Sequence, residues 1–229
     1  MVMDSLRPTV AFLSGSGFPA WYWRDVRDAL GLRSYVVDYL KGDATLTAHA
    51  QAIADGSGNA RLVLVAHSIG GTVATQLCAI APDRVAGILG IAAVFPPPGE
   101  TYLDTLPRRQ RLVERTGIRL LGAKPPRGMI LKAYAKEVPE ATARRLADEF
   151  EPESPRLFTG RVGTPRFPDA RGYILTCKDE GMPPARQERY AAALGATYRR
   201  EIASGHLPML TNADELASLI REFVVDCPS

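Results

Sequence analysis

One stretch in the first third of the chain constrains the fold more than any other. The apolar run from Leu62 to Val65 holds only valine and leucine, as in a strand buried on both faces of a parallel sheet. The residues that follow are Ala66, His67, Ser68, Ile69, Gly70 and Gly71. From Thr72 to Ala81 the pattern becomes helical, and Pro82 ends it.

A strand, a tight turn of small residues and a helix predict a nucleophile elbow with Ser68 at its tip. Such a turn holds the serine in a strained backbone conformation that exposes Oγ. Bulky neighbours would clash there, which explains Ala66 two residues before Ser68 and Gly70 two residues after it. The alternative is an ordinary strand-to-helix turn in which Ser68 caps the helix.

The rest of the chain alternates between strand and helix patterns. The expected strands are 9–13, 34–38, 62–65, 85–94, 172–177 and 197–202. The expected helices between and after them include 20–30, 44–55, 72–81, 183–194 and a last one from Asn212. Alternation of this kind indicates parallel strands joined by right-handed crossovers. The predicted fold class is therefore α/β, with a mainly parallel sheet of about six strands flanked by helices.

Residues 100–170 differ in character, because they are rich in arginine and proline and contain no convincing strand. Helices are expected at 103–116 and 140–150. We interpret 100–170 as a small helical cap inserted into a core made of 1–99 and 171–229. Arg108, Arg111, Arg115 and Arg119 recur at three- or four-residue steps and would share one helical face. A solvated face is favoured, and the alternative is docking of an acidic partner or an anionic substrate.

Composition narrows the function classes. The chain has 229 residues, 46% of them hydrophobic, which suits one domain with a sizeable core. No apolar run is long enough to cross a bilayer, and a net charge of +3 gives no reason to expect nucleic acid. The three cysteines lack metal-ligand spacing and are odd in number, so a reducing cytoplasm is the expected location. No cofactor or metal site is apparent, and the oligomeric state is left open.

Three residue types that work together in catalysis follow three of the expected strands. Ser68, Asp179 and His206 each lie just past a strand end, where ligands bind in parallel sheets. Serine needs a base to take its proton, and histidine titrates in the suitable range. Asp179 would hold the imidazole in the required tautomer and stabilise its charged form. The order serine, aspartate, histidine is that of the α/β-hydrolases.

Neighbouring residues supply further candidates and alternatives. Two backbone N–H groups could stabilise a developing oxyanion: that of Ile69, directly after the serine, and that of Ser16, after the first strand. Glu180 is the main alternative to Asp179. His67 is expected to pack with its ring turned away from Ser68 Oγ, and His49 is expected at the surface.

At these residues the chain resembles the α/β-hydrolase superfamily, and most of all its small-cap branch of plant methylesterases, hydroxynitrile lyases and bacterial esterase relatives. The resemblance covers nearly the whole chain. It rests on Phe12 to Gly17 with Trp21 and Trp23, on Ala66 to Gly71, on Phe95 to Gly99, on Tyr173 with Asp179 and Gln187, and on Ser204 to Leu210. It implies Ser68, Asp179 and His206 as the triad, with Ser16 and Ile69 as oxyanion donors. One departure is Ser14-Gly15, where the branch usually has His-Gly.

The expected activity is hydrolysis of a carboxylic ester or thioester of a small lipophilic molecule through an acyl-enzyme. Met129, Ile130, Tyr134 and Phe158 are expected to line the pocket for that molecule. One alternative keeps the site and changes the reaction to that of a lyase, cyclase or acyltransferase, because a fold does not determine a function. Another is a ligand receptor built on a hydrolase scaffold.

Overall fold

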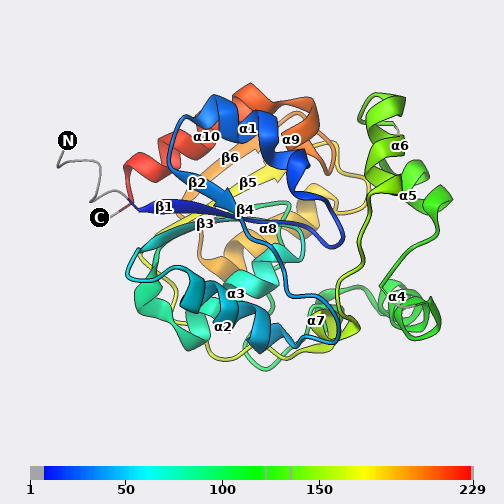
Figure 1. The fold of residues 1–229 in the computed structure, drawn as a ribbon, viewed down its shortest axis with the longest axis horizontal. Coiled ribbons are helices and arrows are strands. Elements are labelled where there is room, and N and C mark those ends of the chain that lie inside the picture. The colour runs from blue at the N-terminus through cyan, green and yellow to red at the C-terminus, as the bar shows by residue number, and fades with distance from the viewer. Residues whose placement is uncertain (1–7, 122, 135, 228–229) are drawn as a thin grey trace.

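Six parallel strands form the centre of the protein. The computed structural model describes residues 8–121, 123–134 and 136–227. Its strands are β1 (Thr9–Leu13), β2 (Ser34–Val36), β3 (Leu62–His67), β4 (Val85–Ile91), β5 (Ala170–Thr176) and β6 (Tyr198–Ile202). They pair in the order β2-β1-β3-β4-β5-β6, and every pair is parallel (Figure 1). The predicted α/β fold with a six-stranded parallel sheet is confirmed.

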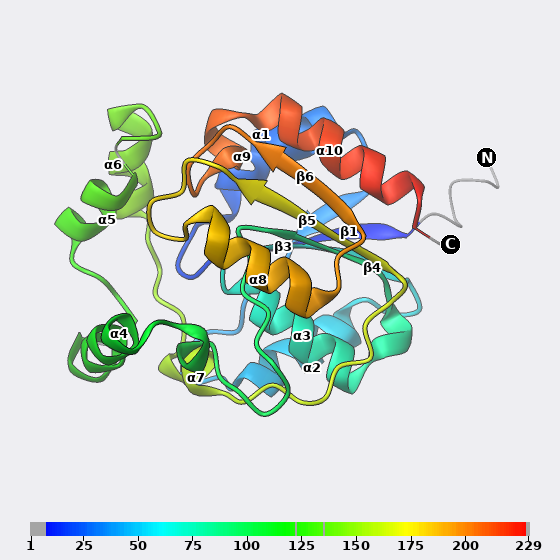
Figure 2. The ribbon, with the colours of Figure 1, turned by 180° about the vertical axis from the view of Figure 1, so that it is seen from behind.

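Helices cover both faces of this sheet (Figures 1 and 2). One face carries α1 (Arg24–Leu30), α9 (Pro208–Thr211) and α10 (Ala213–Val225), and the other carries α2 (Leu46–Gly56), α3 (Gly70–Ile80) and α8 (Pro184–Leu194). Alternate residues of β3 join the two layers. Val63 and Val65 pack in the apolar cluster that includes α1 and α10, whereas Leu62 and Leu64 pack in the cluster that includes α2 and α3. Because both faces are dry, a continuous apolar run is stable here as a central strand.

The segment between β4 and β5 carries α4 (Arg108–Leu121), α5 (Arg127–Tyr134), α6 (Glu140–Asp148) and α7 (Pro155–Thr159). In Figures 1 and 2, α4, α5 and α6 stand beyond the carboxyl ends of the strands, apart from the helices that flank the sheet. Ile130, Leu146 and Phe150 tie this segment to the core, because they pack in one cluster with Phe18. We propose on this basis that the segment is a cap over the edge where ligands bind.

The helix expected at 103–116 was wrong in its bounds. A single 3-10 turn spans Leu103–Thr105, and α4 begins only at Arg108 and continues to Leu121. The proline at 107 lacks an N–H and restricts φ, so it begins a helix but does not continue one. The strand expected to reach 94 also ends early, at Ile91, because Ala92 has a φ of 42° and turns the chain.

His49 is buried, so the expected surface position was wrong. Its side chain is 1% exposed and lies edge-on against Tyr39. The Leu40 N–H donates to His49 Nδ1 over 3.3 Å. His49 lies one turn after Leu46 and is followed by Ala50, so it shares the inner face of α2. Burial lowers its pKa and keeps the imidazole neutral.

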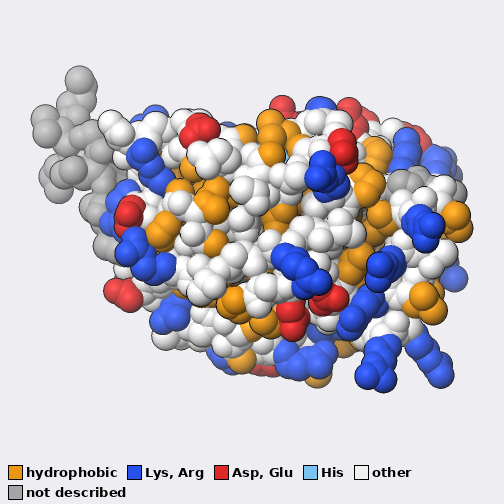
Figure 3. Space-filling model, turned by 90° about the horizontal axis from the view of Figure 1, so that it is seen from below, with side chains coloured by type: hydrophobic (Ala, Val, Ile, Leu, Met, Phe, Trp, Pro, Cys, Tyr) orange, Lys and Arg blue, Asp and Glu red, His pale blue; other side chains and the backbone are white. Residues whose placement is uncertain are grey.

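The arginines of α4 form the predicted face with one exception. Arg108, Arg115 and Arg119 are exposed to solvent. Arg111 is half-buried and turns back, with Nη1 lying 3.4 Å from Asp104 Oδ1 and Nη2 donating to the Asp104 carbonyl. Figure 3 shows Lys and Arg side chains gathered over the end of the molecule where the cap lies. No helix among the described residues is both long and apolar enough to span a bilayer.

Candidate active site

The turn between β3 and α3 holds Ser68 in a strained conformation. Its φ is 53°, in the left-handed region that residues other than glycine rarely adopt. A Cβ at Gly70 would lie 2.5 Å from the Leu13 carbonyl oxygen, and one at Gly71 equally close to that of Val94. No side-chain hydrogen bond caps α3, whose N-cap residue is Ile69. The geometry therefore matches a nucleophile elbow and not a serine cap.

The Gly70→Ala variant is expected to lose about 3 kcal/mol of unfolding free energy, because its new methyl group meets a rigid backbone carbonyl. Gly117→Ala is the matched control, since a Cβ there meets nothing within 4 Å. The control should be neutral or gain up to about 1 kcal/mol, as alanine is the better helix residue. Urea unfolding of both variants measures this difference. Equal stabilities would show that the elbow tolerates a side chain.

Asp179 and His206 form a short buried pair. Asp179 follows β5 and His206 follows β6, and these two strands are neighbours in the sheet. His206 Nδ1 lies 2.6 Å from Asp179 Oδ2. The other carboxylate oxygen accepts the N–H groups of Gly181 and Met182, over 2.9 and 2.8 Å. Both side chains are nearly enclosed: that of His206 is 11% exposed and that of Asp179 is 1% exposed.

These contacts decide the charge of Asp179. Burial alone would raise the pKa of its carboxyl group. The attraction and hydrogen bond of His206, together with the amides of Met182 and Gly181, outweigh burial and place the pKa below its ordinary value. The carboxylate is therefore ionised at neutral pH and contributes stability that is lost only as the pH falls through its folded-state pKa. An ionised acceptor on Nδ1 keeps the hydrogen on that nitrogen and leaves Nε2 available as a base.

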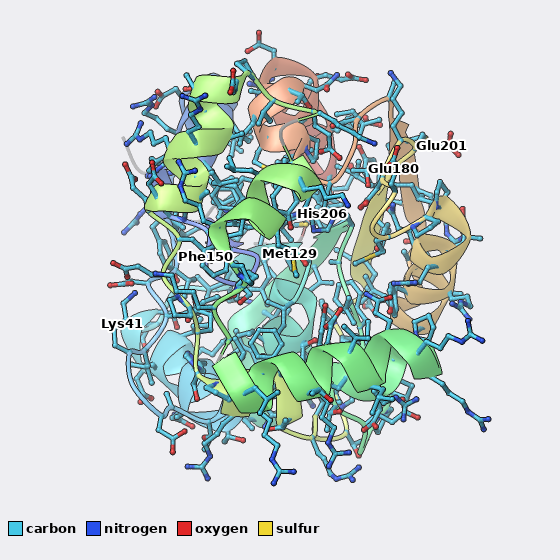
Figure 4. All side chains as sticks on the ribbon, turned by 90° about the vertical axis from the view of Figure 1, so that its right-hand side faces the viewer. Lys41, Met129, Phe150, Glu180, Glu201 and His206 are labelled. Carbon is cyan, nitrogen blue, oxygen red and sulfur yellow. The ribbon has the colours of Figure 1, made fainter. Side chains whose placement is uncertain are left out.

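The loop that carries Asp179 is held by one buried amide. Gln187 on α8 accepts the Thr176 N–H through Oε1 and donates to the Thr176 and Met182 carbonyls through Nε2. Glu180, the alternative acid, is 82% exposed and pairs with Lys136 over 3.4 Å. Figure 4 shows Glu180 displaced from His206 toward the side of the molecule. The structure thus brings Asp179, and not Glu180, to the histidine.

Ser68 and His206 line the same cavity of about 720 Å³. Among the described residues, no hydrogen bond within 3.5 Å joins Ser68 Oγ to the His206 ring. The acid and the histidine are thus hydrogen-bonded, whereas the serine and the histidine line one cavity without a hydrogen bond between them. Such catalytic contacts are often long in a free enzyme and shorten when substrate binds.

The backbone N–H groups of Ile69 and Ser16 are the two candidate donors to an oxyanion. Ile69 follows the serine directly, and Ser16 lies in the loop after β1 and lines a cavity that also reaches Ser68. Within the described parts of the chain, neither N–H donates to a protein acceptor. Free N–H groups beside a nucleophilic serine are the parts from which an oxyanion hole is built. Ser16 Oγ is also buried without a partner.

His67 is fully buried and connects two loops. Its Nε2 lies 2.9 Å from the His206 carbonyl, which can only accept, so Nε2 carries the hydrogen. Nδ1 then accepts from the Tyr22 hydroxyl over 3.3 Å, and that hydroxyl accepts the Gly15 N–H. Burial holds the pKa of His67 well below its ordinary value, as does the nearby His206. A neutral ring therefore links the loop of Ser16 to the loop of His206.

Glu137 is a further residue of the site, and no sequence pattern indicated it. It lies between α5 and α6, and its Oε2 accepts the Leu207 N–H over 3.3 Å. A Cβ on Gly205 would collide with its carboxylate, so glycine there allows the cap to approach the His206 loop. Burial raises the pKa of Glu137 above its ordinary value. Glu137 and Leu207 are far apart in the sequence, so the spacing of neighbouring residues could not predict their contact.

The Glu137→Gln variant is expected to remove the part of the pH dependence of unfolding free energy that the Glu137 carboxyl group causes. The carboxyl group titrates near 4.5 when unfolded and higher when folded. Between these values the folded state holds the Glu137 proton more tightly than the unfolded state, so the contribution of this group to wild-type stability falls as the pH rises. Glutamine retains an acceptor for the Leu207 N–H and does not titrate, so this fall should vanish. Urea unfolding from about pH 4 to about pH 8 measures it; an unchanged slope would assign the effect to another group.

Two cavities meet at Ser68. The first, of about 720 Å³, is called the polar chamber and includes His206, Asp179, Glu137, Gln110, Lys178 and Arg186. The second, of about 370 Å³, is called the apolar chamber and includes Ser16, Phe18, Ile118, Ile130, Phe150 and Phe158. Met129 and Tyr134 line it too, so Met129, Ile130, Tyr134 and Phe158 surround one cavity, as expected, and its role as the substrate pocket stays a prediction. In Figure 4, Met129 and His206 lie at the centre, with Phe150 beside them.

The same edge of the sheet holds no arrangement for a metal ion. Within 8–121, 123–134 and 136–227, no group of three or more His, Cys, Asp or Glu residues could hold one. The cysteines Cys78, Cys177 and Cys227 are free thiols. Burial raises the pKa of Cys78 to about 12, so its thiol is inert.

A parallel sheet with a serine elbow and an acid–histidine pair at one edge defines the α/β-hydrolase class. The sequence model described as the alpha/beta hydrolase family matches residues 10–219. That match spans most of the chain, and the protein belongs to this family. Among curated proteins, none matches the sequence.

Solved structures with the same fold are distant in sequence. An extracellular alpha/beta-hydrolase from a Paenibacillus species, described as sharing structural and functional homology with tobacco salicylic acid binding protein 2, superposes with a TM-score of 0.81 at 18% identity, over 94% of this chain and 98% of that one. A pyrethroid hydrolase from Sphingobium faniae gives 0.74 at 19%, over 96% and 98%. Polyneuridine aldehyde esterase gives 0.72 at 18%, over 96% and 100%. At these identities the likeness establishes the fold alone.

Proposed function

We propose that the protein hydrolyses a carboxylic ester or thioester of a small lipophilic molecule through an acyl-enzyme formed on Ser68. The observation that carries the proposal is the 2.6 Å pair of His206 and Asp179 in the cavity that Ser68 lines. The family supports it, and so does the fold shared with polyneuridine aldehyde esterase and with a pyrethroid hydrolase. The apolar chamber favours a lipophilic substrate.

In the first half of the reaction, Ser68 Oγ attacks the ester carbonyl carbon while His206 Nε2 takes the hydroxyl proton. The carbonyl oxygen becomes an oxyanion, which accepts hydrogen bonds from the N–H groups of Ile69 and Ser16. Asp179 stabilises the imidazolium through Nδ1. The carbon–oxygen bond to the leaving alcohol then breaks, and Nε2 returns the proton to the alcohol oxygen.

In the second half, a water molecule replaces the alcohol. His206 takes one proton from that water as its oxygen attacks the acyl carbon. The bond from the carbon to Ser68 Oγ breaks, the serine recovers its proton from Nε2, and a carboxylic acid leaves. For a thioester the leaving atom is sulfur, and the other steps are unchanged.

Covalent labelling tests the proposal. A fluorophosphonate probe reacts only with an activated serine, so it should label the wild-type protein at Ser68, as peptide mass spectrometry would identify. The His206→Ala variant should lose the label, because the base that activates the serine is gone. Labelling at another serine, or no labelling of the folded protein, would refute the acyl-enzyme.

A further inference from the structure

The two chambers that meet at Ser68 offer different chemistry to the two halves of an ester. Among the described residues that line the apolar chamber, only Glu114 and Lys124 are charged. The polar chamber has charged residues of both signs, among them Glu114, Glu137, Lys132 and Arg186. A site with such unlike halves has a preferred orientation for an unsymmetrical substrate.

The reaction itself decides which half of the ester enters which chamber. The imidazole that takes the serine proton must return it to the leaving oxygen, so the alcohol has to lie beside His206. His206 lines the polar chamber and not the apolar one. Ser16, whose N–H is the proposed oxyanion donor, lines the apolar chamber and not the polar one. The acyl chain therefore points from the carbonyl carbon toward the apolar chamber.

We propose that the substrate is an ester of a lipophilic acyl chain with a small, hydroxylated alcohol, the chain lying in the apolar chamber and the alcohol in the polar chamber. This inference rests on the proposed function, since it assigns orientation by the role of His206. It goes further, because the proposed activity alone leaves open which half of the substrate is lipophilic.

Charge and burial in the polar chamber favour an uncharged alcohol with hydroxyl groups. Glu114 and Glu137 are half-buried, and Lys132 and Lys178 are exposed at the rim of the same cavity. An anion would meet the carboxylates, and a cation would meet the ammonium and guanidinium groups. A hydroxyl group can donate to a carboxylate and accept from an ammonium group, so it suits both signs.

At one position that lines the apolar chamber, a larger side chain can be introduced without strain, which would make the chamber shallower. Gly117 on α4 lines the chamber, and a Cβ added there meets nothing within 4 Å. Leucine at 117 would place its side chain where the end of a long acyl group is expected. Gly128 on α5 is the matched control, because its added Cβ is equally unobstructed and it lines neither chamber. Both changes replace glycine by a better helix former, so loss of folding is not expected.

A pair of isomeric esters tests the orientation. In 2-hydroxyethyl octanoate the acyl half is lipophilic and the alcohol hydroxylated, and octyl glycolate has the same atoms with the halves exchanged. We expect kcat/KM to favour 2-hydroxyethyl octanoate by about 100-fold, since a single methylene in an apolar pocket is already worth tenfold or more. Gly117→Leu should reduce the ratio of octanoate to acetate turnover by about tenfold, and Gly128→Leu should leave that ratio unchanged.

The outcomes separate the inference from the function on which it rests. Equal turnover of the isomers, a preference for octyl glycolate, or an unchanged ratio in Gly117→Leu overturns the assignment of the chambers and leaves the serine hydrolase standing. No turnover of either isomer, together with no fluorophosphonate label on Ser68, removes the proposed function and this inference with it.

Discussion

The Ser68→Ala variant should lower kcat for ester hydrolysis by about 10⁵- to 10⁶-fold, because no covalent intermediate can form without Oγ. Its fold should persist, since Ser68 Oγ makes no capping bond and alanine is smaller than serine. Stopped or continuous assays with p-nitrophenyl esters of several acyl lengths would measure the loss. The measurement also orders these substrates by chain length in the wild-type protein.

The same variant separates hydrolysis from the alternative reactions. A lyase or cyclase that uses His206 only to move protons would retain its own conversion in Ser68→Ala while losing ester cleavage. Residual ester cleavage above about a thousandth of the wild-type rate would instead mean that the serine is not the nucleophile. Circular dichroism and the urea midpoint of the variant show that any loss is not a loss of fold.

Asp179→Asn should lower kcat by about 10⁴-fold. The amide can donate to His206 Nδ1, which moves the hydrogen to Nε2 and removes the base that Ser68 needs. The charge that stabilises the imidazolium is lost as well. The dependence of kcat on pH tests this explanation. If the loss comes from the wrong tautomer of His206, the activity of Asp179→Asn should rise at high pH, where hydroxide can act as the base.

Glu180→Gln is the matched control for this experiment. Glu180 follows Asp179 directly, carries the same charge and is exposed, with Lys136 as its partner. Its kcat should remain within about twofold of the wild type, as expected for a surface ion pair of little energetic value. A severe loss in Glu180→Gln and a small one in Asp179→Asn would exchange the roles of the two carboxylates.

The sheet and the three site segments could be predicted because local patterns determine them. A continuous apolar run such as Leu62 to Val65 is stable only where both faces are dry, and this requirement already specifies a central parallel strand. Parallel strands place their carboxyl ends at one edge, so residues after β3, β5 and β6 had to meet there. The small residues around Ser68 likewise encode the turn by sterics alone.

Other features were beyond the reach of sequence patterns. His49 was expected at the surface because the sequence suggests no acidic or serine partner for it, yet the inner face of α2 carries this histidine against Tyr39. The helix expected at 103–116 was misplaced, because α4 begins only after Pro107, and α5, which follows Pro125 and Pro126, was not expected. Glu137 was missed because its contact with Leu207 spans 70 residues.

The sequence by itself therefore determined the α/β sheet, the elbow at Ser68 and the edge at which serine, acid and histidine gather, since short-range sterics and burial fix each of these. Only the tertiary structure decided that Asp179 and not Glu180 reaches His206, that Ser68 and His206 line one cavity without a hydrogen bond between them, and that one chamber is more apolar than the other. The reason is physical: side-chain direction and cavity shape depend on how the cap packs over the strand ends, and that packing joins residues far apart in the chain.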